Sequence, residues 1–194
     1  MPEYKVEMKL PKSRIAVLIG TDGEVKEQIE EATKTSISID SSEGDVVLTS
    51  KDSVGLFQCK EIVTAIARGF NPNKAMLLLH PEYMLDVLPL KEYCTTKNAM
   101  IRVKGRVIGA EGKSRRMLEE FTETEISVFG KTICIIGKAE DIAIARHAVE
   151  SLLRGAPHSS VYRWLERQRR LSKRRKVLNM DEMLPGGGKD DESS

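Results

Sequence analysis

Apolar and polar residues follow the same order twice along the chain. In each half, a short apolar helical segment leads to a pair of glycines, and a second helix with apolar residues at helical spacing follows them. A short alternating strand comes next, at residues 37–39 and again at 126–128, followed by a tight turn, another strand and a long helix. The pattern also predicts strands at 5–10, 46–49, 84–90 and 132–136, and closing helices at 51–68 and 139–154.

The two halves align with each other as an internal repeat. IGTDG at residues 19–23 matches IGAEG 89 positions later, and TKTSISI at 33–39 matches TETEISV at the same offset. After a shortening of one loop, ARGF at 67–70 matches LRGA 86 positions later. The chain therefore contains two copies of one small module, each of roughly 70 residues.

The element order predicts the fold class. Strand, helix, helix, strand, strand, helix makes an α+β layer, a three-stranded antiparallel sheet covered on one face by three helices. Between the modules, Asn71-Pro72 begins a junction and residues 74–80 look like one short linking helix. The predicted organisation is module one at 4–70, a linker at 71–82, module two at 83–155, a basic amphipathic helical extension at 156–178 and a disordered acidic tail at 179–194.

Charge is distributed unevenly along the chain. The 194 residues include 31 Lys and Arg and 29 Asp and Glu, and the net charge of +2 by itself argues against a nucleic-acid partner. Residues 163–176 nevertheless hold eight basic residues and one acid, whereas residues 177–194 hold five acids and one Lys. Charge as dense as that of the basic segment repels itself without a partner, so we expect contact with RNA phosphate or with a ribosomal surface. The alternative is a solvated helix that Trp164 docks onto the protein.

The paired glycines, at 20 and 23 and again at 109 and 112, connect two predicted helices in each module. Glycine adopts backbone angles that other residues avoid and lets a ligand approach closely. Each turn ends at a helix N-terminus, where free N–H groups and the helix dipole favour a phosphate. A single G-x-x-G is typical of a tight helix–helix turn, but two of them in the same six-element order indicate a shared function.

This arrangement resembles the type I KH module. The resemblance rests on I-G-x-x-G between two helices, then T-x-T-x-I, a hairpin and a long helix, and it covers about residues 4–70 and 83–155. It implies that the G-x-x-G loop clamps about four single-stranded nucleotides. The bases would enter a neighbouring groove, whose lining in the second copy is Val107, Ile108, Leu118, Ile126 and Val128, residues that also suit the core.

A longer pattern narrows the resemblance. The second module followed by LLRGAPHSSVYRWL at residues 152–165 and a basic helix is similar to the partner-of-Nob family, double-KH assembly factors of the small ribosomal subunit. The chain resembles an archaeal member over about residues 4–178. The resemblance implies binding near the 3′ end of small-subunit rRNA and partnership with the Nob endonuclease, which matures that end.

The second module is the better candidate for RNA. Residues 102–116 around its loop carry six basic residues and one acid, whereas residues 12–26 carry three basic residues and two acids. Basic side chains bind nucleic acid by neutralising its phosphates, and the acids in and after the first loop would repel those phosphates. Arg102 and Arg106 are four apart, so we expect both to point toward the loop. The predicted RNA-binding residues are Arg102, Arg106, Ile108, Gly109, Ala110, Glu111, Gly112, Lys113, Arg115, Arg116 and Ile126.

The first loop and the basic helix are secondary candidates, for RNA or for protein. The first KH copy of the resembled family often lacks its glycines, but this chain keeps both, so an RNA contact there stays open. Aromatic residues make up only 5% of the chain, which favours a KH groove over a stacking platform. The secondary contact residues are Gly20, Thr21, Asp22, Gly23, Arg163, Arg167 and Arg170.

No enzyme activity, cofactor or metal site is predicted. GAEGKS at residues 109–114 superficially resembles a nucleotide P-loop, but that pattern needs Gly at the position of Val107 and a strand before the loop. The three His are scattered without metal spacing. Asp40, Asp45 and Asp52 flank a hairpin and could mimic a nuclease cluster, but turns commonly use such residues.

The remaining composition indicates a cytoplasmic protein without a membrane partner. Three Cys make no C-x-x-C pair, and no apolar run is long enough to span a bilayer. The leading hypothesis is a single-stranded RNA-binding assembly factor. An adaptor that links translation or rRNA-processing proteins and a general KH regulator of mRNA are the alternatives.

Overall fold

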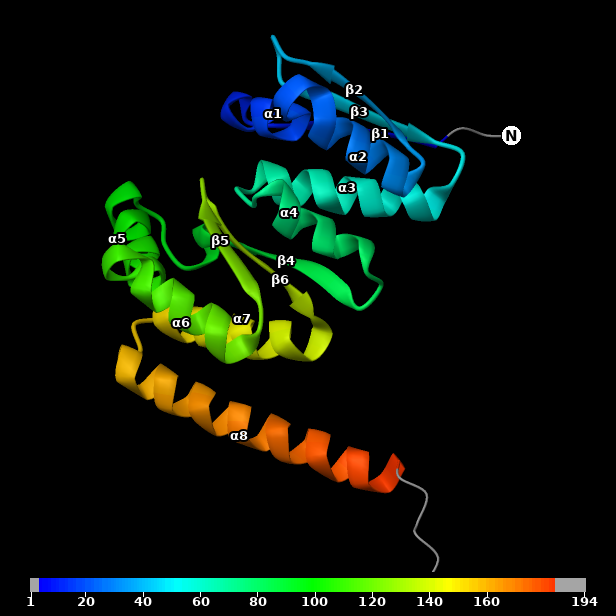
Figure 1. The fold of residues 1–194 in the computed structure, drawn as a ribbon. Helices are drawn as coiled ribbons and strands as arrows, with labels where there is room; N and C mark the ends of the chain where they lie inside the picture. Colours follow the sequence, from blue (N-terminus) through cyan, green and yellow to red (C-terminus); the bar gives the residue numbers. More distant parts are fainter. Residues whose placement is uncertain (1–3, 184–194) are drawn as a thin grey trace, which may run out of the picture.

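Two similar α+β units and a long C-terminal helix make up the protein (Figure 1). The computed structural model describes the backbone of residues 4–183 and the side chains of residues 4–174. The predicted fold class is confirmed, because each unit contains a three-stranded antiparallel sheet with three helices.

Domain 1 follows the predicted order of elements. Its sheet has the strand order β1-β3-β2, and Ile37 and Val6 both pair with Leu48 of the central strand. Ile37 and Leu48 are fully buried beneath the helices. The elements are β1 (Tyr4–Lys9), α1 (Lys12–Ile19), α2 (Glu24–Thr33), β2 (Ser36–Asp40), β3 (Asp45–Ser50) and α3 (Ser53–Ala67).

Domain 2 repeats this topology with the strand order β4-β6-β5. Ile126 pairs with Ile135 of the central strand, and both side chains belong to the core of this domain. The elements are β4 (Tyr83–Pro89), α5 (Lys97–Ile108), α6 (Lys113–Thr122), β5 (Glu125–Phe129), β6 (Thr132–Lys138) and α7 (Ala139–Leu153).

The connection between the domains begins with a short helix, α4 (Pro72–Ala75), which has Pro72 in its first turn. A 3₁₀ turn, Met76–Leu79, follows it directly. The sequence predicted a single linking helix at 74–80. In the structure the helical segment begins slightly earlier, at Pro72, and its second half is a 3₁₀ turn and not an α-helix. Ala75 and Leu78 point into the core of domain 1, so the linker is part of that domain's packing.

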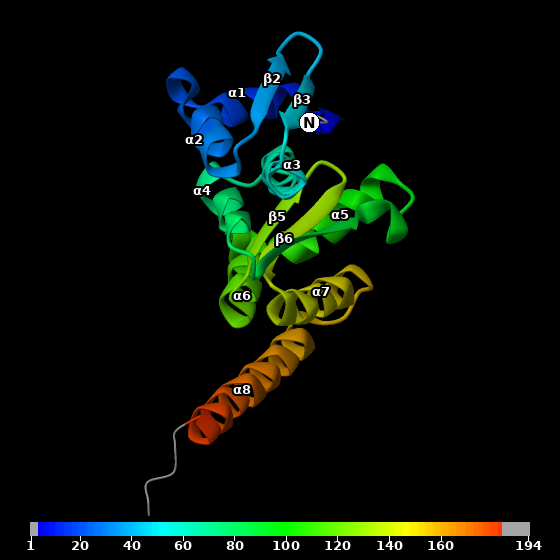
Figure 2. The ribbon, with the colours of Figure 1, turned by 90° about the vertical axis from the view of Figure 1, so that its right-hand side faces the viewer.

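The second sheet is covered on both faces, which differs from the predicted single layer of helices. Figure 2 shows it between α3 on one side and α7 on the other. Ile133 and Ile135 of β6 face the core of domain 2, whereas Cys134 and Ile136 belong to the core cluster of domain 1. The two domains therefore share buried apolar surface.

Polar contacts reinforce this junction at the edge strand β5. The Ser127 hydroxyl donates to the carbonyl of Arg68 at 2.9 Å, and the Lys74 ammonium pairs with Glu125. Gly69 has a φ of +99°, and a Cβ there would lie 2.8 Å from Phe129 Cβ. The close approach of the two domains at this point therefore depends on this glycine.

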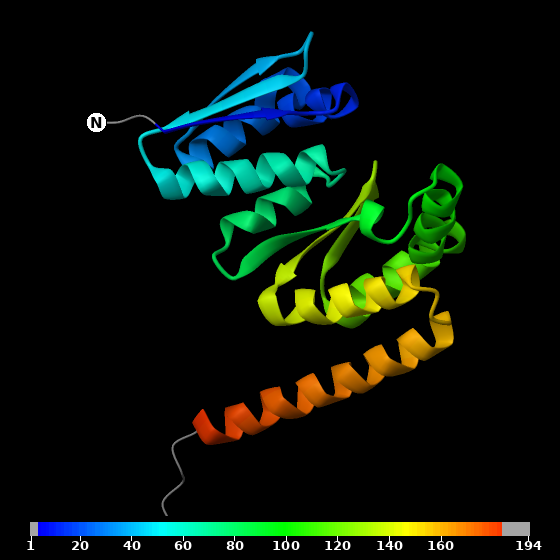
Figure 3. The same ribbon diagram turned by 180° about the vertical axis from the view of Figure 1, so that it is seen from behind.

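Helix α8 (His158–Met183) lies against domain 2 and its far end projects away from the domain (Figure 3). Val161 and Leu165 are buried, and the Trp164 ring lies 4.4 Å from that of His147. The sequence placed the helical extension at 156–178 and a disordered tail at 179–194. Residues 179–183 instead continue the helix, and residues 184–194 lie outside those described.

No helix in the described part of the chain is long and apolar enough to cross a membrane. Cys59, Cys94 and Cys134 are free thiols buried in the protein. Burial raises the pKa of the Cys59 thiol, and it raises the pKa of Cys134 to about 11.

Candidate nucleic-acid interface

The two G-x-x-G loops adopt the same backbone conformation. Gly20 and Gly109 have φ, ψ angles of 74°, −175° and 72°, 176°. The third positions, Asp22 and Glu111, are left-handed in both copies, with φ of 52° and 51°. A Cβ on Gly109 would lie 2.7 Å from Ser114 Cβ, so the sharp turn between α5 and α6 requires glycine there.

Each loop ends at a helix N-terminus, and the charges in the first turn of that helix differ between the copies. In domain 1 the first turn of α2 carries Glu24 and Glu27. At the equivalent positions, 89 residues later, α6 carries Lys113 and Arg116 and has no acid in its first turn. A carboxylate offsets the positive end of the helix dipole. The two glutamates therefore offset the dipole at the start of α2, whereas no acid in the first turn offsets it at the start of α6.

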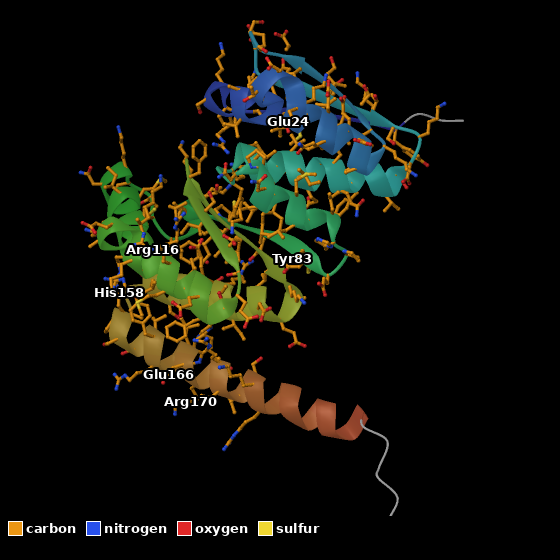
Figure 4. The ribbon with its side chains drawn as sticks, viewed as in Figure 1. Glu24, Tyr83, Arg116, His158, Glu166 and Arg170 are labelled. Atoms are coloured by element: carbon orange, nitrogen blue, oxygen red, sulfur yellow. The ribbon has the colours of Figure 1, made fainter. Side chains whose placement is uncertain are left out.

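The second loop also presents unpaired cations. Arg102, Lys113 and Arg116 are exposed, and within residues 4–174 their side chains form no hydrogen bond or ion pair. Ala110 and Glu111 are exposed at the tip of the loop. Arg116 lies on the same side of the molecule as His158 at the start of α8 (Figure 4). Lys113 and Arg116, in the first turn of α6, form an anion-binding surface together with the N-terminus of that helix.

Arg106 does not share this position, which corrects the prediction that it points toward the loop with Arg102. Its guanidinium donates from Nε to the Leu152 carbonyl at 2.9 Å and from Nη2 to the Ala156 carbonyl at 2.6 Å. Arg106 therefore ties α5 to the end of α7. Arg14 does the same in domain 1, through the carbonyls of Ile66 and Phe70.

Ile126 also differs from its predicted place, because its side chain is only 2% exposed and belongs to the core. Its backbone reaches the outer edge of the sheet instead. The Ile126 N–H donates to Glu119 Oε1 at 2.9 Å, and its carbonyl accepts from Arg115 Nη1 at 3.4 Å. Arg115 is thus half-buried and partly engaged. Of the predicted groove residues, Val107 and Leu118 are fully buried, whereas Ile108 and Val128 keep exposed surface.

Helix α8 begins beside the second loop. The Tyr162 hydroxyl donates to Ser114 Oγ at 3.0 Å, and His158 Nε2 lies 2.8 Å from the Arg106 carbonyl. The predicted secondary contacts Arg163, Arg167 and Arg170 are exposed along α8, and Arg170 pairs with Glu166 (Figure 4). Arg163 and Arg167 therefore lie on a helix whose first turns pack beside the start of α6.

The carboxylates that could mimic a nuclease cluster have structural partners. Asp40 accepts hydrogen bonds from Ser42 in its own turn, and Asp52 accepts from the N–H groups of Val54 and Gly55 at the start of α3. Within the described residues, no group of three His, Cys, Asp or Glu is arranged to hold a metal ion. A helix, α5, precedes GAEGKS, as the sequence predicted in arguing against a P-loop.

Asn71 and Lys74 were not singled out from the sequence. Both line a pocket with Arg115, Glu119 and other residues at the junction between the domains. Their only sequence signal was an Asn-Pro turn, which carries no information about the partner surface.

Two family models match the chain. The KH domain model covers residues 5–65, and the eukaryotic-type KH domain, KH type I, covers residues 84–170. A KH domain-containing protein of Methanocaldococcus jannaschii is 44% identical over 86% of this chain and 75% of its own length. The pre-rRNA-processing protein pno1 of Schizosaccharomyces pombe is 32% identical over 58% of this chain and 48% of its own length.

Two solved structures from Pyrococcus horikoshii are similar over most of the chain. The crystal structure of Dim2p has 45% sequence identity and a TM-score of 0.79, and covers 84% of this chain and 99% of that one. A chain from the complex of a/eIF2alpha, aDim2p and rRNA has 44% identity and a TM-score of 0.81, and covers 87% of this chain and 95% of that one.

Proposed function

The chain belongs to the family of double-KH proteins that includes Dim2p and PNO1, and from this premise we propose that it is a single-stranded RNA-binding factor of ribosome assembly. Its RNA is the region near the 3′ end of small-subunit rRNA, and domain 2 is the domain that binds it. The relative crystallised with rRNA and the relatives called pre-rRNA-processing proteins support this assignment.

One observation carries the choice of domain 2. Its G-x-x-G loop has the same backbone as that of domain 1, but the helix behind it begins with Lys113 and Arg116 in place of two glutamates. Backbone N–H groups, the helix dipole and these cations converge on one point. A phosphate completes that arrangement in domain 2, and the first-turn carboxylates repel it in domain 1.

The rest of the binding surface follows from the edge strand. Because Ile126 directs its N–H and carbonyl to the outer edge of the sheet, the same groups of Val128, two residues later, face that edge as well. They offer a donor and an acceptor to the edge of a base. The exposed parts of Ile108 and Val128 supply apolar contact to its face.

The basic face of α8 extends the site. Arg163 and Arg167 are exposed on a helix that starts beside Ser114, so RNA that leaves the loop passes along a row of cations. Arg contacts to phosphate raise affinity without reading sequence. We place this activity in the cytoplasm, in partnership with a Nob-type endonuclease that cuts near the bound segment.

The test exchanges the charges that distinguish the two loops. The double variant Lys113→Glu, Arg116→Glu should lower the affinity for an oligonucleotide of the rRNA 3′ end by about a hundredfold, since two charge-assisted contacts of about 1.5 kcal/mol each are lost. The slope of log affinity against log salt should also fall by about 2. Fluorescence anisotropy at several salt concentrations measures both quantities.

The matched control is Glu24→Lys, Glu27→Arg in domain 1, which should leave this affinity unchanged or slightly raise it. A scrambled oligonucleotide serves as the second control, and equal affinity for it would favour a general mRNA-binding protein. If the domain 2 variant binds RNA as the unaltered protein does, the assignment of the site is wrong.

A role as a protein adaptor is favoured by one observation, the similarity to a chain from a complex that also contains a/eIF2alpha. That complex holds rRNA too, so in the relative the two partners are present together. We therefore treat protein binding as an addition to RNA binding and not as a replacement for it.

A further inference from the structure

A pocket of about 300 Å³ lies between the two domains, and residues of both line it. Arg14 comes from α1 of domain 1, and Asn71 and Lys74 from the linker. Arg115 and Glu119 come from α6, and Glu125 from β5 of domain 2. Neither domain forms this pocket alone.

The pocket opens along the element that the RNA must follow. It includes Ile126 and Ser127 on β5, the edge strand whose outer edge faces the proposed nucleotide groove. Its walls are held in place by the shared core, by the bond from Ser127 to the Arg68 carbonyl and by the pair between Lys74 and Glu125. An RNA strand bound to domain 2 therefore passes a preformed cavity that domain 1 completes.

The charged groups around the pocket already have partners. Lys74 pairs with Glu125, Arg115 lies 3.9 Å from Glu119, and Arg14 donates to two carbonyls. Asn71 differs from these charged residues. Its neutral side-chain amide is exposed and makes no capping hydrogen bond at the start of α4. The polar group that remains for a ligand is thus the Asn71 amide, which carries a neutral hydrogen-bond donor and an acceptor side by side.

We propose that this pocket binds one nucleobase of the RNA, next to the nucleotides that the G-x-x-G loop of domain 2 clamps. An amide offers the paired donor and acceptor that the edge of a base presents, and asparagine matches adenine in this way. A bare phosphate lacks a donor and would compete with carboxylates for cations that are already paired. A volume of about 300 Å³ is at the lower limit for small-ligand sites, which suits a single base.

The inference rests on the proposed function and adds to it. RNA recognition would then extend beyond about four nucleotides, and domain 1 would contribute through its linker and not through its own glycine loop. The pocket would also make recognition depend on the fixed orientation of the two domains.

The test is a set of seven-nucleotide RNAs from the small-subunit rRNA 3′ end, each with one abasic nucleotide at a different position. One abasic position outside the clamped segment should weaken binding to the unaltered protein about tenfold. In Asn71→Ala that same position should carry no further penalty, because the base has lost its partner. Asn73→Ala, an exposed asparagine of the same linker that does not line the pocket, should behave as the unaltered protein does.

The outcomes separate the two proposals. If no abasic position loses its penalty in Asn71→Ala, the base pocket is wrong, whatever the affinity of domain 2. If Lys113→Glu, Arg116→Glu leaves binding of the intact RNA unchanged, the proposed assignment of RNA binding to the loop of domain 2 is wrong. Loss of binding in that variant together with unaltered behaviour of Asn71→Ala would overturn only the pocket.

Discussion

Arg14 and Arg106 show how two similar arginines acquire roles that charge counting does not reveal. Each donates to two carbonyls at the end of its domain's closing helix, and those carbonyls are 86 positions apart, as the repeat predicts. The arginines themselves are 92 positions apart, about one helical turn out of register with the loops. Self-alignment of the sequence therefore predicted the loops but could not show this contact.

Arg106 and Arg102 should separate stability from binding. Arg106→Ala removes two hydrogen bonds from a charged donor, so the free energy of unfolding should fall by about 2 kcal/mol. Arg102 is exposed and unpaired in the described structure, so Arg102→Ala should change that free energy by less than about 0.5 kcal/mol and weaken RNA binding several-fold. Urea unfolding and fluorescence anisotropy measure the two effects.

Equal losses of stability in both variants would contradict this division of roles. Retained stability in Arg106→Ala would show that the bonds to Leu152 and Ala156 contribute little and would return Arg106 to the RNA-binding surface.

Among the elements, strand β6 carried a signal that the sequence analysis did not use. Its residues 133–136, ICII, are apolar at successive positions, a pattern typical of a strand buried on both faces. Ile133 and Ile135 pack in the core of domain 2, but Cys134 and Ile136 point to the other face and need a second cover, which domain 1 supplies. In β3 the alternation is cleaner, and the face opposite the helices stays partly exposed.

Helix α8 was predicted because Val161, Trp164, Leu165 and Leu171 recur at helical spacing, but this spacing could not show how much of the helix docks. Leu165 is 1% exposed and Leu171 is 48% exposed. Leu165→Ala should therefore lower the free energy of unfolding by about 2–4 kcal/mol, whereas Leu171→Ala should be near neutral. Thermal unfolding followed by circular dichroism makes the comparison.

A loss at Leu165 would show that α8 is part of the cooperative structure of domain 2. If both substitutions proved neutral, α8 would be a separate arm, and its basic face would not be held beside the second loop.

For the whole molecule, the sequence predicted which modules exist but not how they pack. The internal repeat predicts that the two copies have the same fold, but it does not indicate which surfaces of the two domains pack against each other. The net charge of +2 similarly conceals a cationic second loop and an internally compensated first one. Both the shared core and the junction pocket depend on packing between residues far apart in the chain, such as Asn71 and Glu119.

The shared core predicts that the two domains unfold together. Cys134 belongs to domain 2 in sequence but packs in the core of domain 1 with Cys59, and burial raises its pKa to about 11. At pH 8 only about a thousandth of such a thiol is the reactive thiolate, so labelling requires exposure. In single-cysteine variants treated with a thiol reagent across a urea series, Cys134 and Cys59 should become reactive at the same urea concentration. Labelling of Cys134 while Cys59 stays protected would show that the domains part before domain 1 unfolds, and the pocket between them would then open and close in solution.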